Sequence, residues 1–261
     1  MHAHHTESIR RTIEFFEKDP RTQALILGGS IAHGLASATS DVDVMILISD
    51  EDYQERLQAG QLQFFDRQLC TYPEGYVDGK YLRSAFLRQV AERGSEPARF
   101  AFSDARVLFS RVAGLEDLLR ACARYPAEGK EERLRRFYAQ FEAWNWYAHE
   151  ALRLNNRYLL GVSIGKLVLF GGRLILTCNE MLYPYHKWLL KRLEQAPDKP
   201  NGLLDAINDL YANPSDAAVT AFYERVKAFH AWPAPPAGWP SQFMFDSELN
   251  WANGPAPVDD I

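Results

Sequence analysis

The sequence predicts an α/β (α+β) domain followed by an all-α helical bundle. Over residues 1–124, short apolar runs that suit strands alternate with amphipathic segments of helix length. Beyond Tyr125 and Pro126 this alternation disappears, and long helical segments follow one another. A chain of 261 residues is long enough for two such domains, each with its own apolar core.

The first domain is expected to span residues 1–124 and to begin with a helix. Residues 7–18 carry apolar side chains at helical spacing, and the pair Asp19-Pro20 ends that helix. The elements that follow are predicted as strand 24–27, strand 42–48, extended segments 61–69 and 75–79, helix 81–92, strand 105–109 and helix 114–123.

The second domain is expected to span residues 125–231 and to contain only helices. Its predicted helices cover residues 130–158, 159–178, 180–194, 201–211 and 215–231. Aromatic residues surround the first of these helices, which favours a central position in a bundle. Residues 232–240 are too rich in proline for regular helix, so residues 232–261 are predicted to form an extended aromatic tail that packs back on the protein.

Composition narrows the class of protein. A formal net charge of -5 argues against a general nucleic-acid binder, whose surface would be basic. The three cysteines are far apart and lack metal-site spacing, which indicates reduced thiols in a cytoplasmic protein. The longest apolar stretch, residues 159–178, is interrupted by Lys166 and Arg173, so no membrane span is expected. Composition leaves monomer and homodimer open.

Two aspartates at the start of a very apolar strand form the most informative motif. Asp41 and Asp43 are two residues apart, so their side chains point to the same face of the strand. Two carboxylates held together need a cation to neutralise them, and hard oxygen ligands suit magnesium. Asp41 and Asp43 are therefore predicted metal ligands, although such a pair is also common at an exposed strand end.

A glycine turn precedes these aspartates. Gly28 and Gly29 end the strand 24–27 and would let a triphosphate approach the backbone, and Ser30 would open a short helix. The turn is not a Walker A loop, because no Gly-Lys-Ser/Thr follows. By itself a Gly-Gly-Ser sequence indicates only a turn. Its order and spacing relative to Asp41 and Asp43 indicate a nucleotide site.

This pattern resembles the DNA polymerase β-like nucleotidyltransferase superfamily, which includes aminoglycoside and lincosamide nucleotidyltransferases linked to antibiotic resistance. Further stretches look like a bacterial subfamily of these enzymes: residues 76–80, 93–102, 170–173, 179–188 and 246–251. The resemblance implies a catalytic domain with a mixed sheet and a helical domain that binds the acceptor. It also implies transfer of a nucleoside monophosphate, AMP from ATP in our reading, to a hydroxyl of a small molecule, with release of pyrophosphate.

The same resemblance implies a third carboxylate on a neighbouring strand and two magnesium ions, which manganese could replace. Asp78 in Tyr-Val-Asp-Gly is the best match and is expected to serve mainly the second ion, while Asp66 is the rival candidate. Relatives that modify aminoglycosides carry a general base in the helical domain, for which Glu180 is preferred to Glu142 and Glu150. Each of these glutamates could equally be a solvent-facing helix residue.

Two cations in an apolar helix need an explanation. Lys166 and Arg173 are seven residues apart, hence on one helical face, and a triphosphate is one ligand that would account for them. A carboxylate partner or a surface position would account for them equally well. Weaker candidates for phosphate contacts are Arg99, His186 and Lys187, and His33 is expected beside the site.

Alternative functions remain at this level. A toxin–antitoxin or regulatory nucleotidyltransferase acting on protein or RNA would usually be a shorter chain without the helical domain. A non-catalytic binding module would have lost Asp41 or Asp43, and both are present. The acidic net charge disfavours a polymerase.

Overall fold

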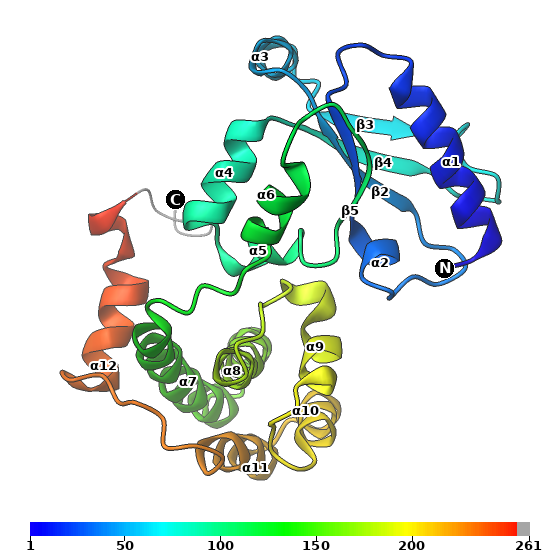
Figure 1. Ribbon diagram of the computed structural model, residues 1–261. Coiled ribbons are helices and arrows are strands. Elements are labelled where there is room, and N and C mark those ends of the chain that lie inside the picture. The colour runs from blue at the N-terminus through cyan, green and yellow to red at the C-terminus, as the bar shows by residue number, and fades with distance from the viewer. Residues whose placement is uncertain (255–261) are drawn as a thin grey trace. The chain divides into compact units, whose positions relative to one another are not determined.

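The computed structural model describes residues 1–254, and the chain forms two compact units (Figure 1). The first unit spans Met1–Tyr125 and the second begins at Pro126. Each unit has its own apolar core. The division falls one residue from the boundary expected between residues 124 and 125.

The first unit is built on one five-stranded sheet with the order β3-β4-β2-β1-β5. Strands β2 and β4 run parallel and the other neighbours are antiparallel, which confirms the expected mixed sheet. The strands are β1 (Ala24–Leu27), β2 (Val42–Leu47), β3 (Gln63–Asp66), β4 (Val77–Leu82) and β5 (Arg106–Ser110).

Six helices accompany the sheet, and three of them cover its two faces (Figure 1). They are α1 (Ala3–Glu17), α2 (Gly29–Ala32), α3 (Asp50–Gln58), α4 (Ser84–Arg93), α5 (Glu96–Phe100) and α6 (Leu115–Cys122). Because side chains alternate along a strand, Leu25 and Leu27 of β1 pack with α1, whereas Ala24 and Ile26 pack with α4 and α6.

Two of the differences from the predicted elements of the first unit concern β4 and α3. Tyr81 and Leu82 belong to β4 and not to the helix predicted from residue 81, because they pair with Ile46 and Leu47 of β2. The helix starts only at Ser84. Helix α3 was not predicted, and its low apolar content explains this: none of its residues is buried.

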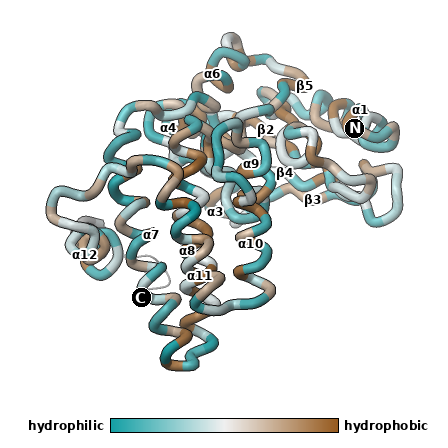
Figure 2. Tube along the Cα trace, turned by 90° about the horizontal axis from the view of Figure 1, so that it is seen from below, coloured by the Kyte–Doolittle hydropathy of each residue, from teal (hydrophilic) through white to brown (hydrophobic). Residues whose placement is uncertain are grey.

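The second unit is helical throughout, as expected. Its long helices are α7 (Lys130–Arg153) and α8 (Arg157–Cys178), followed by the 3-10 turn η1 (His186–Trp188), α9 (Leu189–Gln195), α10 (Leu203–Ala212) and α11 (Asp216–Lys227). Hydropathy along the chain shows apolar stretches on α8 (Figure 2). Phe141 of α7 and Phe222 of α11 are fully buried in the same core.

Within the described residues, α8 is also the single helix that is long and apolar enough to cross a membrane. Half of its most apolar 18-residue window is buried inside the unit, and Leu167, Leu174 and Ile175 are completely inaccessible. These properties are those of a core helix.

The predicted helix 180–194 is wrong in its first half. After α8 ends at Cys178, Glu180 and Tyr185 both adopt positive φ angles, 54° and 68°, which no helix contains. Pro184 lies between them and disfavours helix at Tyr183. Regular helix resumes with α9 at Leu189.

The C-terminal segment differs from the extended tail that we expected. It forms α12 (Gly238–Phe243), a π-helical turn η2 (Met244–Glu248) and a 3-10 turn η3 (Asn250–Asn253). Pro240 is compatible with helix because it lies in the first turn, where its missing N–H is not needed. Phe243 is buried against Trp144 and Tyr147 of α7, whereas Phe245 and Trp251 are exposed. Residues 255–261 lie outside the described part of the chain.

Candidate active site

The glycine turn after β1 is attached to the strand that carries the aspartates. The backbone N–H of Gly28 donates a hydrogen bond of 2.9 Å to the carbonyl oxygen of Asp43. Gly29 follows with φ of 60°, a left-handed conformation that favours glycine, and begins the four-residue helix α2. Ser30, in that helix, is buried.

Gly29 lies directly against the side chain of Asp43. A Cβ atom at Gly29 would overlap Oδ2, Cγ and Cβ of Asp43, so a side chain at this position could not coexist with the present carboxylate. Because the overlap includes Cβ, a change of the Asp43 rotamer would not remove it. The turn and the carboxylate therefore form one closely packed unit.

The parallel pairing of β2 and β4 brings two of the predicted ligands together. Asp43 and Asp78 are direct partners in the register, so their side chains leave neighbouring strands on the same face. Asp41 precedes Asp43 by two residues and shares that face. All three aspartates are half-buried.

The phenol of Tyr76 lies within the electrostatic influence of all three carboxylates. The pKa of the Tyr76 phenol is raised, first by the negative charge of Asp41, and further by partial burial and a hydrogen bond to the same carboxylate. The charges of Asp78 and Asp43 add to this rise. One phenol thus experiences all three carboxylates. Its place in the sequence, two residues before Asp78, was the signal that could have identified it.

The register separates Asp78 from its rival. Asp66 is the partner of Val77 in the antiparallel β3–β4 pair, which places it on the opposite face of the sheet from Asp78. The Asp66 carboxylate accepts backbone hydrogen bonds of 2.5 Å from Gln68 and 3.2 Å from Leu69. Asp66 therefore closes the turn after β3.

The residues fit a divalent cation by their chemistry. Within residues 1–254, no three acidic, histidine or cysteine side chains already enclose a metal position. Three carboxylates on one face repel each other until a cation joins them, so an open arrangement is expected of such ligands alone. The buried hydroxyl of Ser30 has no hydrogen-bond partner in the described residues, so it is available to a ligand.

Two other residues of the first unit have partners of their own. The buried His33 side chain lies 2.8 Å from a carboxylate oxygen of Asp104 and stacks on Phe100. Arg99 donates through its guanidinium to the carbonyl oxygens of Gly94 and Ala91, at 2.9 and 3.2 Å. Arg99 thus closes the C-terminal end of α4, where those carbonyls lack helical partners.

The predicted nucleotide ligands of the second unit have contrasting surroundings. Lys166 is exposed and has no ion pair or hydrogen bond with any residue from 1 to 254. The guanidinium of Arg173 lies between two aromatic rings, 4.3 Å from the centre of Phe137 and 4.4 Å from that of Tyr183. Lys166 is therefore available for a ligand, and Arg173 already makes two cation–π contacts.

The three glutamates considered as general base are all engaged. Glu180 follows α8 and forms a 2.9 Å ion pair with Lys130. Glu150 forms an exposed ion pair with Arg153 on the same helix.

Glu142 is the most enclosed of the three glutamates. It accepts hydrogen bonds from the hydroxyls of Tyr138 and Tyr223, the latter at 2.7 Å. Burial raises the pKa of both phenols, and Glu142 raises it further. Lys227 lies 3.7 Å from the same carboxylate. The whole group joins α7 to α11.

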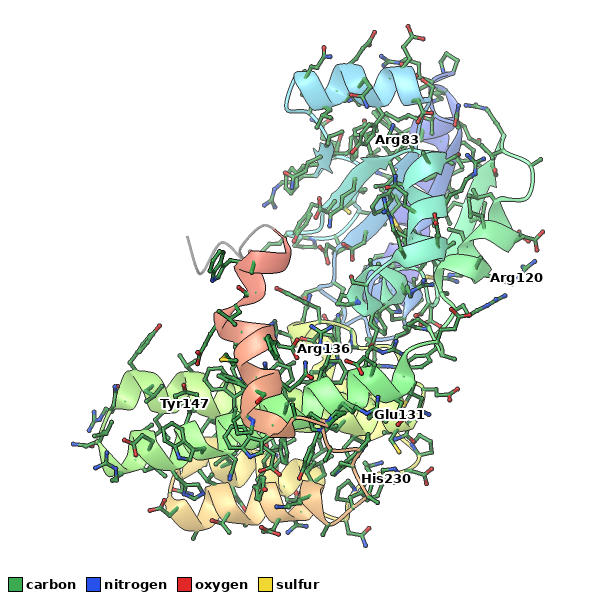
Figure 3. The ribbon with its side chains drawn as sticks, turned by 90° about the vertical axis from the view of Figure 1, so that its left-hand side faces the viewer. Arg83, Arg120, Glu131, Arg136, Tyr147 and His230 are labelled. Atoms are coloured by element: carbon green, nitrogen blue, oxygen red, sulfur yellow. The ribbon has the colours of Figure 1, made fainter. Side chains whose placement is uncertain are left out.

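The second unit also contains a cavity of about 940 Å³ that sequence reasoning did not identify. Its walls come from α7, α8 and the C-terminal segment. Arg136 of α7, labelled in Figure 3, forms a 2.8 Å ion pair with Asp246 of η2. Six aromatic side chains line the cavity: Phe137, Trp144, Tyr147, Phe170, Phe243 and Trp251. Its charged lining residues are Arg133, Arg136, Lys166, Asp246 and Glu248.

Comparison with known proteins shows that part of the chain is similar to a family of known domains. Residues 9–93 match the family model described as a nucleotidyltransferase domain. The chain is also similar to a nucleotidyltransferase-like protein from Exiguobacterium sibiricum 255-15, at 14% identity over 95% of this chain and 79% of that chain, with a TM-score of 0.46. A comparison with curated proteins gives no match. The similarity to a nucleotidyltransferase domain thus lies within the first unit.

Proposed function

We propose that this protein transfers AMP from ATP to a hydroxyl of a small-molecule acceptor. The premise is the match of residues 9–93 to the nucleotidyltransferase domain family. The observation that carries the proposal is the pairing of Asp43 with Asp78 beside the Gly29 turn. Nucleotidyl transfer in general follows from the domain, whereas the donor, the acceptor and the residues in their roles are the proposal.

In the proposed reaction, the acceptor oxygen forms a bond to the α-phosphorus of the triphosphate. The bond from that phosphorus to the bridging oxygen of the β-phosphate breaks, and pyrophosphate leaves. The acceptor proton passes to a base. The protein is asked mainly to position the two reactants and to neutralise charge.

Asp41, Asp43 and Asp78 would hold two magnesium ions, or manganese in their place. Such ions, when bound, neutralise phosphate charge and lower the pKa of a coordinated hydroxyl. The three carboxylates suit this role because hard oxygen atoms are the ligands that magnesium prefers.

The glycine turn is the proposed triphosphate site. Gly29 packs against the Asp43 side chain, which brings the turn next to the proposed metal ligands. The Ser30 hydroxyl is buried with no hydrogen-bond partner among residues 1–254 and would donate to a phosphate oxygen. Lys166 and Arg173 are proposed as further phosphate ligands. For Lys166 the proposal is supported because its ammonium group forms no ion pair or hydrogen bond with residues 1–254.

The cavity in the helical unit supports a small-molecule acceptor. Its volume of about 940 Å³ suits a compound of metabolite size. Its lining has three basic and two acidic side chains, so it lacks the excess of carboxylates that a polycationic aminoglycoside would require. We therefore propose an acceptor with an apolar or ring-shaped part. Three free thiols are in keeping with a cytoplasmic location.

The test is incubation of the protein with magnesium, labelled ATP, GTP, CTP or UTP, and a library of small hydroxyl compounds, followed by mass spectrometry of nucleotide-bearing products. A protein or RNA product in place of a small-molecule product would favour the regulatory or toxin–antitoxin alternative. Product that persists undiminished after Asp43→Asn and Asp78→Asn would refute the site.

A further inference from the structure

The loop that leads into β2 is attached to the N-terminal end of α1 and to a tyrosine. His4 Nε2 donates to the carbonyl oxygen of Ala38 at 2.8 Å, and His5 Nε2 donates to that of Ser40 at 3.1 Å. The hydroxyl of Tyr72 donates to the same Ser40 oxygen at 2.5 Å. Since a carbonyl only accepts, both histidines must carry the proton on Nε2.

The three donor rings hold one another in place. The ring of Tyr72 lies 4.4 Å from that of His4 and 5.3 Å from that of His5, measured between centroids. The two histidine rings are 4.4 Å apart. His5 is completely buried, so its orientation is determined by packing as well as by hydrogen bonding.

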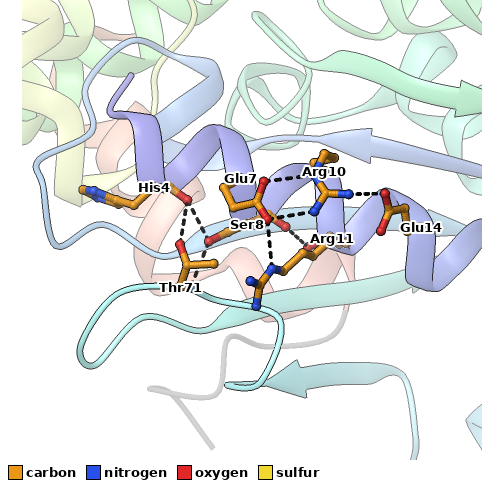
Figure 4. Close-up of polar contacts among 8 residues, drawn as sticks. His4, Glu7, Ser8, Arg10, Arg11, Glu14 and Thr71 are labelled. Atoms are coloured by element: carbon orange, nitrogen blue, oxygen red, sulfur yellow. Dashed lines mark hydrogen bonds and ion pairs between the residues drawn. The ribbon is translucent and has the colours of Figure 1, made fainter.

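A second set of hydrogen bonds connects the tyrosine's segment to α1 (Figure 4). Ser8 donates its hydroxyl proton to the carbonyl oxygen of His4 at 2.8 Å and accepts from the backbone N–H of Thr71 at 3.2 Å. The Thr71 hydroxyl reaches the same His4 oxygen at 3.4 Å. Residue 72 therefore cannot move independently of α1.

These contacts determine the backbone at Asp41. The carbonyl of Ser40 and the N–H of Asp41 belong to one planar peptide, so two hydrogen bonds to that oxygen orient the peptide before Asp41. The peptide after Asp41 is held because the N–H of Val42 donates to the backbone carbonyl oxygen of Tyr76 at 3.0 Å. With both flanking peptides held, the φ and ψ angles of Asp41 have little freedom.

Asp41 needs this support more than its partners do. Asp43 and Asp78 lie within the paired strands β2 and β4, whose ladder holds their backbones. Asp41 lies just before β2 begins at Val42, beyond the end of that ladder.

We propose that His5 and Tyr72 are positioning residues that hold the Ser40 carbonyl and thereby present the Asp41 carboxylate to a divalent cation. The role of Asp41 as a metal ligand rests on the proposed function, whereas the clamp on Ser40 does not. We call His5 and Tyr72 together the Ser40 clamp.

The first test measures Mn²⁺ binding to the full-length protein by calorimetry. Tyr72→Phe removes one hydroxyl and should raise the Kd for Mn²⁺ roughly tenfold, the usual effect of losing a group that orients a metal ligand. Tyr158→Phe is the matched control, because that phenol is exposed and makes no such contact. His5→Phe should also weaken binding, and His5→Gln, which retains a donor, should restore part of it.

Turnover separates positioning from a general structural effect. For Tyr72→Phe the magnesium concentration for half-maximal activity should rise, with kcat at saturating magnesium close to that of the unmodified protein. Melting temperatures of the same samples identify any variant that has lost its fold. An unchanged Kd for Mn²⁺ in a folded Tyr72→Phe protein would overturn the proposal.

Hydrogen exchange keeps the clamp testable if the metal assignment fails. Asp41→Asn should abolish Mn²⁺ binding, and failure of the unmodified protein to bind Mn²⁺ would count against the proposed function. In either case Tyr72→Phe should accelerate amide exchange in residues 37–42. Unaltered exchange there would show that Tyr72 does not hold the loop.

Discussion

Gly29 packs against the Asp43 carboxylate so closely that a Cβ atom on the glycine would overlap it. This contact joins the turn after β1 to the first residues of β2. A glycine is needed at this position for two reasons: its φ angle is positive, and Asp43 occupies the space that a side chain would fill.

Gly29→Ala should therefore abolish nucleotidyl transfer and weaken Mn²⁺ binding. Gly34→Ala is the matched control: Gly34 has φ of 70° but nothing lies within 4 Å of its would-be Cβ. Gly34→Ala should lose about 1–2 kcal/mol of stability from the left-handed conformation, and Gly29→Ala should lose more because of the overlap with Asp43. Chemical unfolding and Mn²⁺ titration compare the two variants side by side. Equal metal affinity in the two variants would refute the role of the contact between Gly29 and Asp43.

Asp78→Asn should reduce turnover by roughly a hundredfold or more, with a much smaller change in triphosphate affinity. The reason is that Asp78 is expected to bind mainly the second metal ion. Asp66→Asn, on the opposite face of the sheet, should leave both quantities nearly unchanged. Steady-state kinetics and ATP binding decide the matter, and a comparable loss of turnover and affinity for Asp78→Asn would show a different role.

Glu142→Gln should destabilise the helical unit by about 1–3 kcal/mol, because the two tyrosine hydroxyls share this acceptor. Glu150→Gln, which breaks an exposed ion pair, should change stability by less than about 1 kcal/mol. Thermal unfolding compares the two. If a folded Glu142→Gln protein loses its activity, the carboxylate has a catalytic role that its hydrogen bonds do not suggest.

Lys166→Met and Arg173→Met should both raise the KM for the nucleoside triphosphate if these cations bind phosphate as proposed. Their effects on stability should differ. Arg173 loses two cation–π contacts, each of about 0.5–2 kcal/mol, whereas exposed Lys166 loses no ion pair or hydrogen bond with residues 1–254. A KM unaffected by Lys166→Met would remove that residue from the nucleotide site.

Stability should fall as the pH decreases from about 6.5, and His5 should contribute to the fall. Burial, together with the neighbouring imidazoles, lowers the pKa of His5 in the folded protein. Between the lowered pKa and about 6.5, the unfolded chain binds more protons than the folded one, so acidification favours unfolding. His5→Gln cannot titrate and should show a shallower dependence in melts at pH 5 to 7. An identical slope would mean that His5 titrates normally.

The elements around the candidate site illustrate how far local patterns reach. Residues 24–27 are a strand with the predicted bounds, since a short apolar run ended by two glycines admits few other structures. The i and i+2 spacing of Asp41 and Asp43 already implied a common face. By contrast, the helix predicted from residue 180 failed, because the backbone at Glu180 and Tyr185 adopts conformations that periodicity does not encode.

Local spacing and residue type were thus enough to predict the mixed α/β unit, the helical unit and one pair of carboxylates, since side-chain periodicity follows directly from backbone geometry. Three features depended on contacts between residues distant in sequence. These are the choice of face that separates Asp78 from Asp66, the clamp on Ser40 and the aromatic cavity of the helical unit. Strand register and the return path of the chain decide such contacts, and both are set by packing of the whole unit.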